Sequence, residues 1–381
     1  MKRGWSNIGL TEIATLERRP VDVSETESYP EVGVRCFGKG LFHKAPRSGL
    51  EVGDKKLFRL KRGDFILQVT FAWEGAVAVV SAEDESLFGS VRVLTFQIDK
   101  KRATPEFLFR YFQTRAGVEQ LARISPGSAG RNRVLAIQRL GEVSVPLPSL
   151  AEQQRLTDRL DAIETRLTRI RQLRDEQTQA LRAALRSSFH RLITSAEWKT
   201  LAEVAPLAWR KVEIESEATY TEFGVRSFYK GVFLRRRVLG AVFDWQELYR
   251  LRAGDIVFSN IMAWEKAIAV AGPEHDGWVG NHRMLICEPR QEVISASCLL
   301  HYFMTEEGFE KILQASPGTA ARNKTLKADR LMDIKVPVPP LAAQREFQKL
   351  LTLQAQVTAR AAESDSAAIA ILPSLLDQIF N

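Results

Sequence analysis

The chain has 381 residues, of which 45% are hydrophobic and 26% are charged, and its formal net charge is +8. A chain of this length can form two domains of ordinary size, each with its own core. No apolar run approaches the ~20 residues that a membrane-spanning helix needs, and no apolar stretch follows the basic N-terminus, so we expect neither a membrane span nor a secretory signal. These properties predict a cytoplasmic globular protein.

The net charge and the cysteines indicate which partners and which kinds of site the protein can have. Lysine and arginine neutralise phosphates and release counterions, so a positive net charge favours a polyanionic partner, although many basic proteins bind no nucleic acid. The three cysteines, Cys36, Cys287 and Cys298, are too few and too scattered for a disulfide framework or a cysteine-rich zinc site. We therefore expect them to be packing residues.

The dominant feature of the sequence is an internal repeat. A shift of 191 residues aligns the two halves without a gap from Leu10 to beyond Leu150, with roughly one position in three identical. This period far exceeds the ~20–50 residues of solenoid repeats, which predicts two complete globular units with one fold. Matching segments include Gly33–Arg35 with Gly224–Arg226, Ala72–Glu74 with Ala263–Glu265, Ser125–Gly127 with Ser316–Gly318, and Val145–Pro148 with Val336–Pro339.

The first part of each copy is rich in short β-branched runs. In the first copy, Phe65–Val69 and Ala76–Val80 predict strands, and Gly63-Asp64 predicts a tight turn that enters the first of them. The second copy has equivalent runs at Asp255–Phe258 and Ile268–Val270.

A helix and a basic loop follow in each copy. Apolar residues at helical spacing predict a helix from Pro105 to about Ala122, and an equivalent helix from Ser297 to about Gln314. A Pro-Gly loop ends each helix, and a basic segment that contains Arg-Asn comes next.

The apolar period changes again after Pro148. Apolar residues then alternate steps of four and three, and this heptad pattern predicts a helix from about Glu152 to Arg191. Such a helix would be ~60 Å long at 1.5 Å per residue. It cannot bury its apolar stripe alone, so it needs a partner helix.

The partner is predicted to be the equivalent helix of the second copy. This helix begins near Ala342, and Pro373 should kink it. We predict an antiparallel coiled coil that acts as a ruler between the two domains, the alternative being two separate surface helices. The residues expected to form the coil or to contact partner proteins are Leu156, Leu160, Ile163, Leu167, Ile170, Leu181, Leu372 and Leu376.

One phrase occurs twice where a domain meets its helix. Val145–Arg155 reads VPLPSLAEQQR, and Val336–Arg345 reads VPVPPLAAQR. The phrase resembles the signature that joins each target-recognition domain to its conserved helix in specificity (S) subunits of Type I restriction-modification systems, the Type I restriction DNA specificity domain family. The resemblance covers nearly the whole chain in the order domain, helix, domain, helix.

The motif also has a physical reason. Its prolines force an extended entry into the helix, and Glu152 and Gln153 follow in the first turn, where their side chains can satisfy free backbone N–H groups. The second copy has Ala343 in place of Glu152, so its helix start is predicted to be less well capped.

The resemblance implies an α+β fold. Two homologous mixed α/β target-recognition domains would be separated by long helices that form an antiparallel coiled coil. The expected domains are residues 1–150 and 195–341, and the expected helices are residues 151–194 and 342–381.

The resemblance also implies a function without catalysis in this chain. Each domain would read one half of an asymmetric bipartite DNA target, and the helices would dock two methyltransferase (modification) subunits. Those subunits would bind S-adenosylmethionine and methylate adenine, and a restriction/motor subunit would cleave unmodified DNA. We expect no cofactor, no metal and no catalytic residue in this chain. The triplet Glu197-Trp198-Lys199 has the Glu-x-Lys spacing of many nucleases but lacks a preceding Pro-Asp strand, which favours a structural role.

The repeat helps to choose residues that would contact DNA. Cations shared by both copies suit phosphate contacts, and cations that differ suit base reading, because arginine can grip guanine through O6 and N7. Arg235, Arg236 and Arg237 are the candidates for specificity in the second domain. The full set of predicted DNA-binding residues is Arg35, Lys39, Lys44, Arg47, Arg92, Arg131 and Arg133 in the first copy and Arg226, Lys230, Arg235, Arg236, Arg237, Arg283, Arg322 and Lys324 in the second.

Other functions stay open from the sequence alone. The chain could be a stand-alone tandem DNA-binding regulator that uses the same domains without enzyme partners. It could also be the specificity subunit of a fused methyltransferase-nuclease. A self-contained nuclease with an unrecognised site is a third alternative.

Overall fold

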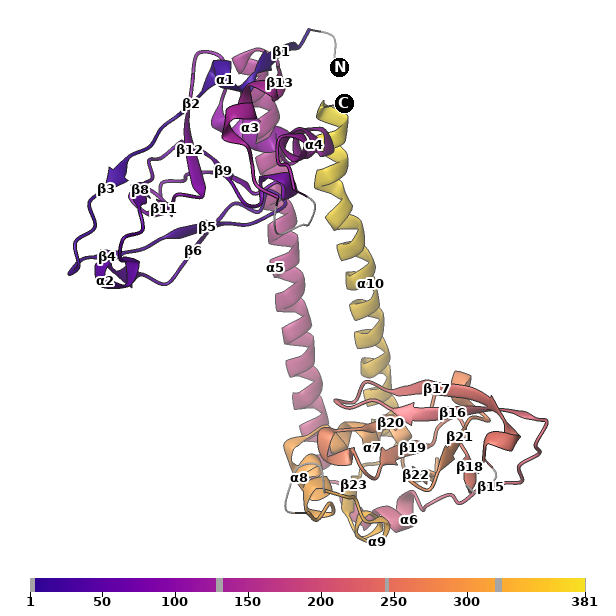
Figure 1. Ribbon diagram of the computed structural model, residues 1–381. Helices are drawn as coiled ribbons and strands as arrows, with labels where there is room; N and C mark the ends of the chain where they lie inside the picture. Colours follow the sequence, from indigo (N-terminus) through magenta and orange to yellow (C-terminus); the bar gives the residue numbers. More distant parts are fainter. Residues whose placement is uncertain (1–3, 128–132, 244–246, 319–323, 381) are drawn as a thin grey trace. The chain divides into compact units, whose positions relative to one another are not determined.

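The structure is a computed structural model that describes residues 4–127, 133–243, 247–318 and 324–380 (Figure 1). The chain divides into two compact units, one made of Met1–Arg174 with Ala361–Asn381 and the other of Asp175–Arg360. Both long helices contribute residues to each unit. Among the described residues, no helix is long and apolar enough to cross a membrane.

The strands of the first unit form several small sheets (Figure 1). Their bounds are β1 Ser6–Gly9, β2 Ala14–Leu16, β3 Pro20–Val21, β4 Ser28–Tyr29, β5 Val32–Val34, β6 Leu41–His43, β7 Arg47–Ser48, β8 Leu57–Arg59, β9 Phe65–Gln68, β10 Val77–Val79, β11 Phe88–Ser90, β12 Val93–Ile98 and β13 Ser144–Leu147. A four-stranded sheet has the order β10-β9-β12-β2, a three-stranded sheet has the order β11-β8-β3, and β4-β7, β5-β6 and β1-β13 form pairs. The strands predicted at Phe65–Val69 and Ala76–Val80 are confirmed as β9 and β10.

The second unit repeats this organisation. Its strands are β14 Glu197–Thr200, β15 Lys211–Val212, β16 Thr219–Val225, β17 Val232–Leu239, β18 Leu248–Arg250, β19 Ile256–Ser259, β20 Ile268–Val270, β21 Val279–Asn281, β22 Met284–Cys287 and β23 Lys335–Val338. They form the orders β15-β18-β21-β16-β17, β20-β19-β22 and β14-β23. A parallel bridge joins Glu222 to Val279, and the residues 191 positions earlier, Glu31 and Phe88, are joined in the same way.

The helices also occur in equivalent places in the two units. They are α1 Leu10–Ile13, α2 Gly49–Val52, α3 Pro105–Tyr111, α4 Arg115–Arg123, α5 Leu150–Thr194, α6 Leu201–Val204, α7 Ala296–Phe303, α8 Glu306–Gln314, α9 Ala328–Met332 and α10 Leu341–Phe380. The 3₁₀ helices are η1 Ala72–Glu74, η3 Ile137–Glu142, η4 Gly240–Phe243, η5 Ala263–Glu265 and η6 Pro273–His275.

The single helix predicted from Pro105 to about Ala122 is wrong, because the structure divides it into α3 and α4. Thr114 begins α4 as an N-cap, since its Oγ1 accepts a hydrogen bond from the Gly117 N–H at 3.1 Å. Thr305 does the same for α8 through the Gly308 N–H at 3.1 Å. Side chains that bond to nearby backbone groups favour such helix starts, and the apolar periodicity does not register the break.

The turn predicted at Gly63-Asp64 is confirmed and is fastened by an ion pair. Asp64 is buried and accepts hydrogen bonds from the Lys61 N–H at 2.9 Å and from Arg19 Nη1 at 2.6 Å. The corresponding Asp255 accepts from the Arg252 N–H and from Arg210 Nη1, both at 2.7 Å. The shared aspartate therefore shapes the turn that enters the central strand of each unit.

The far end of each long helix completes the core of a unit. In the first unit, Phe380 at the end of α10 lies 5.2 Å from the Phe107 ring and 5.9 Å from the Trp5 ring. In the second unit, Phe189 near the end of α5 lies 5.1 Å from the Phe347 ring at the beginning of α10. Within each unit the start of one long helix thus packs beside the end of the other, which is the antiparallel pairing predicted from the heptads.

The predicted coil positions are buried to very different degrees. Leu156, Leu160 and Leu376 are buried in the first unit's core and Leu372 packs against it, whereas Ile163, Leu167 and Leu181 are half-buried. Ile170 is 41% exposed. The helix α10 runs through Pro373, so this proline does not end it.

We expect Phe380→Ala to lower the free energy of unfolding of the first unit by about 3 kcal/mol, because the substitution removes a buried ring and leaves a cavity. Ile369→Ala on the same helix is the matched control, since Ile369 is 66% exposed, and it should change the value by less than about 0.5 kcal/mol. Urea unfolding followed by tryptophan fluorescence measures both. Equal effects of the two substitutions would contradict the packing of Phe380.

Candidate nucleic-acid interface

A hairpin carries two of the shared cations of the first unit, Arg35 and Lys39. The strands β5 and β6 are joined by a tight loop that closes with a 2.9 Å hydrogen bond from the Arg35 N–H to the Gly40 carbonyl. Arg35 and Lys39 are both exposed at this loop. The Arg35 guanidinium lies over the Phe42 ring at 5.3 Å, which holds the charged group at the surface of the hairpin.

The second unit has the same hairpin between β16 and β17. The Arg226 N–H donates to the Gly231 carbonyl at 3.0 Å, and the Arg226 guanidinium lies over the Phe233 ring at 5.2 Å. Lys230 occupies the position of Lys39 and is also exposed. The sequence repeat is therefore also a repeat of cation geometry.

Each hairpin tip rests on the Ala-Trp-Glu turn. In the first unit the Phe37 N–H donates to the Glu74 carbonyl and the Gly38 N–H to the Gly75 carbonyl, both at 2.8 Å. Burial and the Glu74 carboxylate raise the pKa of the neighbouring Cys36 thiol to about 11. Hence Cys36 is a neutral packing group at this junction, as the sequence predicts.

Two further predicted cations lie beside the first unit's turn. The Arg133 guanidinium lies 4.9 Å from the centre of the Trp73 ring and donates to the Ser125 carbonyl at 3.2 Å. The Arg92 carbonyl accepts from the Val69 N–H at 2.9 Å, which places this exposed residue next to the end of β9. We call this surface the cationic face. It comprises the hairpin tip, the Ala-Trp-Glu turn, Arg92 and Arg133.

The cationic face has a counterpart in the second unit. The Phe228 N–H donates to the Glu265 carbonyl at 3.0 Å, and the Asn260 N–H donates to the Arg283 carbonyl at 2.8 Å. Lys324 is half-buried. Two other predicted DNA-binding residues, Arg131 and Arg322, lie outside the described residues.

A buried carboxylate engages most of the cations chosen for base reading. Glu222 is 1% exposed and pairs with Arg235 Nη1 at 3.0 Å and with Arg236. Arg237 is exposed, as Arg235 is, but no ion pair to Arg237 is found within the described parts of the chain. An arginine that pairs with a buried carboxylate has to break that pair to grip a guanine edge, so Arg237 is the best placed of the three.

The first unit has the same carboxylate at Glu31. This side chain is 3% exposed and accepts from Arg47 Nε at 2.9 Å, and Lys44 Nζ lies 3.8 Å from its other oxygen. The predicted DNA contacts of Lys44 and Arg47 stay predictions. Their observed partner is the glutamate that stabilises the base of the hairpin.

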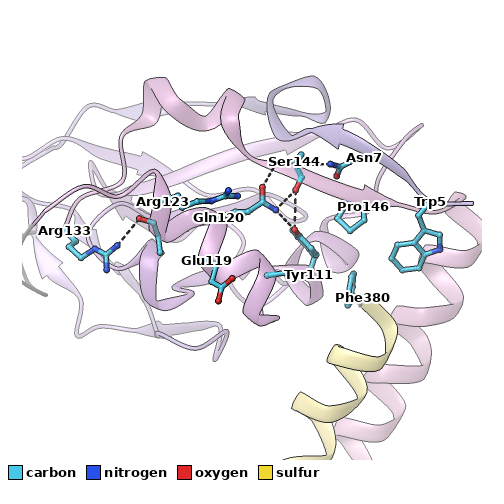
Figure 2. Close-up of a pocket in the computed structure, with 12 residues that line it drawn as sticks. Trp5, Asn7, Tyr111, Glu119, Gln120, Arg123, Arg133, Ser144, Pro146 and Phe380 are labelled. Atoms are coloured by element: carbon cyan, nitrogen blue, oxygen red, sulfur yellow. Dashed lines mark hydrogen bonds between the residues drawn. The ribbon is translucent and has the colours of Figure 1, made fainter. Parts of the chain in front are cut away.

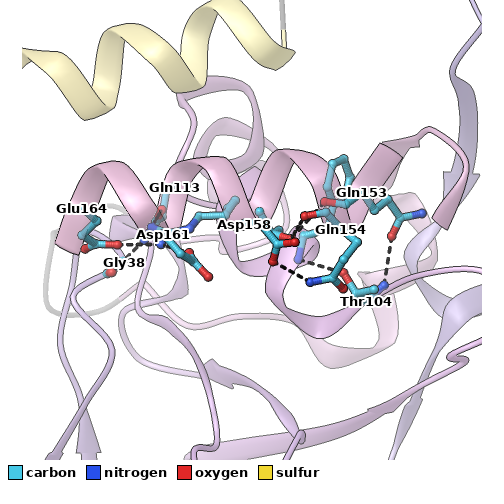
Figure 3. A network of polar contacts seen from close by, with 11 residues as sticks. Gly38, Thr104, Gln113, Gln153, Gln154, Asp158, Asp161 and Glu164 are labelled. Carbon is cyan, nitrogen blue, oxygen red and sulfur yellow. Dashed lines mark hydrogen bonds and ion pairs between the residues drawn. The ribbon is translucent and has the colours of Figure 1, made fainter. Parts of the chain in front are cut away.

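The repeated glutamine of the proline motif joins each long helix to its unit, and Figure 3 shows Gln153 of the first unit. Gln153 is fully buried, accepts from the Thr104 N–H at 2.9 Å, and donates to the carbonyls of Arg102 at 2.9 Å and Pro148 at 3.0 Å. Gln344 makes the equivalent bonds to Ser295, Val293 and Pro339.

The helix-capping role predicted for the motif's acidic and amide side chains is therefore wrong for Gln153. Its amide satisfies the loop before α3 instead of its own helix. The first turn of α5 is capped by Ser149, whose Oγ accepts from the Glu152 N–H at 3.3 Å. The corresponding residue before α10 is Pro340, which has no hydroxyl.

A polar chain connects α5 to the first hairpin tip (Figure 3). The buried Arg110 guanidinium pairs with Asp161 and Glu164 of α5, and it donates to Gln113 Oε1 at 3.2 Å. Gln113 in turn donates to the Gly38 carbonyl at 2.9 Å. The orientation of the tip is thus coupled to the long helix.

A cleft of about 780 Å³ lies in the first unit beside the end of α10 (Figure 2). Trp5 and Phe380 line one end and Arg133 the other. Between them, Gln120 donates to the Ser144 carbonyl at 2.7 Å and accepts from the Ser144 N–H at 2.8 Å. Since these lining groups satisfy one another, the cleft is a surface groove with no assigned ligand. Within the described residues, no group of three or more His, Cys, Asp or Glu side chains could hold a metal ion.

Residues 2–178 match the family model described as the Type I restriction modification DNA specificity domain. This part of the chain is therefore similar to a DNA specificity domain. This match confirms the resemblance inferred from the repeated proline motif. No curated protein sequence matches the chain.

Two solved structures have a fold similar to that of this chain. The HsdS subunit from Thermoanaerobacter tengcongensis has a TM-score of 0.64 at 18% sequence identity, with 100% of this chain and 97% of that chain covered. A chain from a study of the complex assembly and conformational transition of the type I R-M system has a TM-score of 0.68 at 19% identity, with 100% and 98% covered. These likenesses confirm the predicted fold class of two mixed α/β domains with long helices.

Sequence reasoning missed three features of the candidate interface. Glu31 and Glu222 are identical under the 191-residue shift, but only cations were compared between the copies. The aromatic residues Phe37 and Phe228 are also shared. The division of the cations into paired and exposed groups had no sequence signal, because it depends on which side of the hairpin faces the buried glutamate.

We expect Glu222→Gln to lower the free energy of unfolding of the second unit by about 2 kcal/mol, because it removes a buried charge that pairs with two guanidinium groups. Glu247→Gln is the control in the same unit. Glu247 pairs with Lys211 at the surface, where both side chains are more than half exposed, and the change should be below about 1 kcal/mol. Urea unfolding of the two variants tests this, and a control that loses as much stability would refute the structural role of Glu222.

Proposed function

We propose that this chain is the DNA-recognition subunit of a Type I restriction-modification system and that each unit reads one half of an asymmetric bipartite DNA sequence. The duplication is the observation that carries the proposal. The specificity domain matches residues 2–178, and its cationic face recurs 191 residues further along with the same hairpin and the same Ala-Trp-Glu turn. Two copies of one reader suit two half-sites.

The differences between the copies support an asymmetric target. The shared Arg35 and Arg226 suit phosphate contacts, which position a protein without reading sequence. Arg237 is exposed in the second unit, where the first unit has Pro46. Different side chains beside the same hairpin would recognise different bases.

Enzyme partners complete the proposal. Two methyltransferase subunits would bind S-adenosylmethionine and methylate adenine, a restriction/motor subunit would cleave unmodified DNA, and this chain would supply no catalytic group. Support for docking comes from exposed apolar side chains on α5 and α10, since such groups mark protein contacts. They are Ile170 at 41%, Leu173 at 45%, Leu350 at 41%, Leu353 at 51% and Ile369 at 66%. The cytoplasmic location expected from the sequence is part of this proposal.

Co-expression with the methyltransferase subunit encoded beside this chain, followed by sequencing of the host methylome, tests the function. Adenine methylation should occur at one asymmetric bipartite motif. Exchange of residues 1–150 or 198–340 for those of a related chain should change one half of the motif and leave the other. A stable complex without new methylation would favour a stand-alone regulator, and metal-dependent cleavage by the purified chain alone would contradict the non-catalytic role.

Substitutions on the cationic face should separate positioning from reading. Arg35→Ala or Arg226→Ala should weaken binding of all duplexes equally and reduce the slope of log K against log salt by about 1, because one phosphate contact is lost. Arg237→Ala should relax specificity in the second half-site only. Lys349→Ala, an exposed cation of α10, is the control and should change neither. Fluorescence anisotropy at several salt concentrations measures the slopes, and unchanged slopes for both arginine variants would exclude these residues from the interface.

A further inference from the structure

The tip of each hairpin carries an aromatic side chain that is exposed to solvent. Phe37 in the first unit is 71% exposed, and Phe228, at the equivalent position of the second unit, is 65% exposed. Both residues have a φ of +60°. Two copies of the chain's fold therefore present the same side chain in the same uncommon backbone conformation.

This arrangement is unfavourable for the isolated protein. A bulky residue rarely adopts a left-handed backbone conformation, which glycine adopts without strain. An exposed ring also contributes nothing to a hydrophobic core. Since residues held in strained conformations concentrate at functional sites, retention of phenylalanine in both copies points to recognition.

The tips are braced in these conformations from two sides. Backbone hydrogen bonds join Phe37 to Glu74 and Phe228 to Glu265. In the first unit Gln113 also fixes the Gly38 carbonyl, and in the second unit the Tyr229 hydroxyl donates to the Phe303 carbonyl at 2.6 Å. The phenylalanine rings are consequently presented on a preorganised support and not on a loose loop.

Cations flank each ring. Lys39 Nζ lies 6.0 Å from the Phe37 ring centre and Lys230 Nζ lies 5.9 Å from the Phe228 ring centre, with Arg35 and Arg226 at the other end of each loop. Duplex DNA presents phosphates on both sides of an apolar stack of bases. An apolar ring between two cations therefore complements DNA better than it complements the apolar centre of a protein interface, where charged residues are depleted.

We propose that Phe37 and Phe228 are wedges that insert between adjacent base pairs, one in each half-site, while the flanking cations hold the phosphates on either side. This inference rests on the proposed DNA-recognition function. Each wedge unstacks one base step, so the cost of binding depends on how readily that step opens. Pyrimidine–purine steps open most readily, and each unit should prefer such a step under its tip. The wedge thus contributes to specificity at a step that no side chain reads by hydrogen bonds.

The test uses the complex with the methyltransferase and a duplex that contains the motif identified by methylome sequencing. 2-Aminopurine replaces single bases outside the methylated adenines, one position per duplex, and its fluorescence rises where a base is unstacked. We expect a several-fold rise at one step in each half-site. Phe37→Gly should abolish the first rise and leave the second, Phe228→Gly should do the reverse, and each should weaken binding about tenfold, as is typical when one side chain stacked on a base is removed.

Glycine is the chosen replacement because it adopts a φ of +60° without strain, so neither variant should lower the melting temperature. The control is Leu50→Ser, because Leu50 is 71% exposed, as Phe37 is, and does not belong to the hairpin. Serine is used there because glycine would destabilise the short helix that contains Leu50. This variant should leave both fluorescence rises intact. Binding by the wild-type complex with no rise that depends on Phe37 or Phe228 would overturn the wedge and leave the proposed function standing. Absence of duplex binding by the wild-type complex would overturn both. Loss of the methyltransferase subunit from the variant complexes would overturn the wedge in favour of protein docking at the tips.

Discussion

The packing of Phe380 and Phe189 into aromatic clusters is the contact on which the rest of the structure depends. Phe380 comes from the end of α10 and packs in a core that includes Leu156 from the beginning of α5. Phe189 comes from the end of α5 and packs in a core that includes Phe347 from the beginning of α10. Core packing is dense, and removal of a buried ring leaves a void that the surroundings fill only in part. Neither unit is complete without residues distant in the chain.

Both units also contain the same set of hydrogen-bonded polar residues beside these apolar cores. Gln153 and Gln344 tie the long helices to the loops before α3 and α7, Asp64 and Asp255 shape the central turns, and the buried glutamates engage cations beside the hairpins. A buried polar group is costly unless its partners are present, so these residues specify one arrangement of the loops. The geometry of the cationic face therefore depends on these buried polar residues.

The duplication separates the framework from the recognition surface. A shared residue that is buried and fully bonded, such as Gln153, has a structural reason for its identity in both copies. A shared residue whose side chain is mostly exposed, such as Phe37, is not explained by packing within the unit. This contrast is the reason that the hairpin tips, and not the buried glutamate clusters, carry the inferences about DNA.

The sequence by itself determined the features that depend on local chemistry and on the repeat. The two-unit organisation, the strands β9 and β10, the turn at Gly63-Asp64 and the beginnings of the long helices all follow from residue periodicity and turn residues. The family resemblance followed from a motif that occurs twice. The break between α3 and α4 was not predicted from the sequence, because a threonine cap interrupts a helix without disturbing the apolar period.

Only the tertiary structure decided which shared polar residues are bonded and which are exposed. Gln153 lies in the first turn of its helix, yet two of its partners, Thr104 and Arg102, are some 50 positions earlier in the chain. Arg235 and Arg237 are two residues apart on one strand and both are exposed, yet Arg235 pairs with Glu222, whereas no ion pair to Arg237 is found in the described residues. Such differences arise because burial and ion pairing depend on neighbours that are distant in sequence, whereas periodicity and turn chemistry depend on neighbours along the chain.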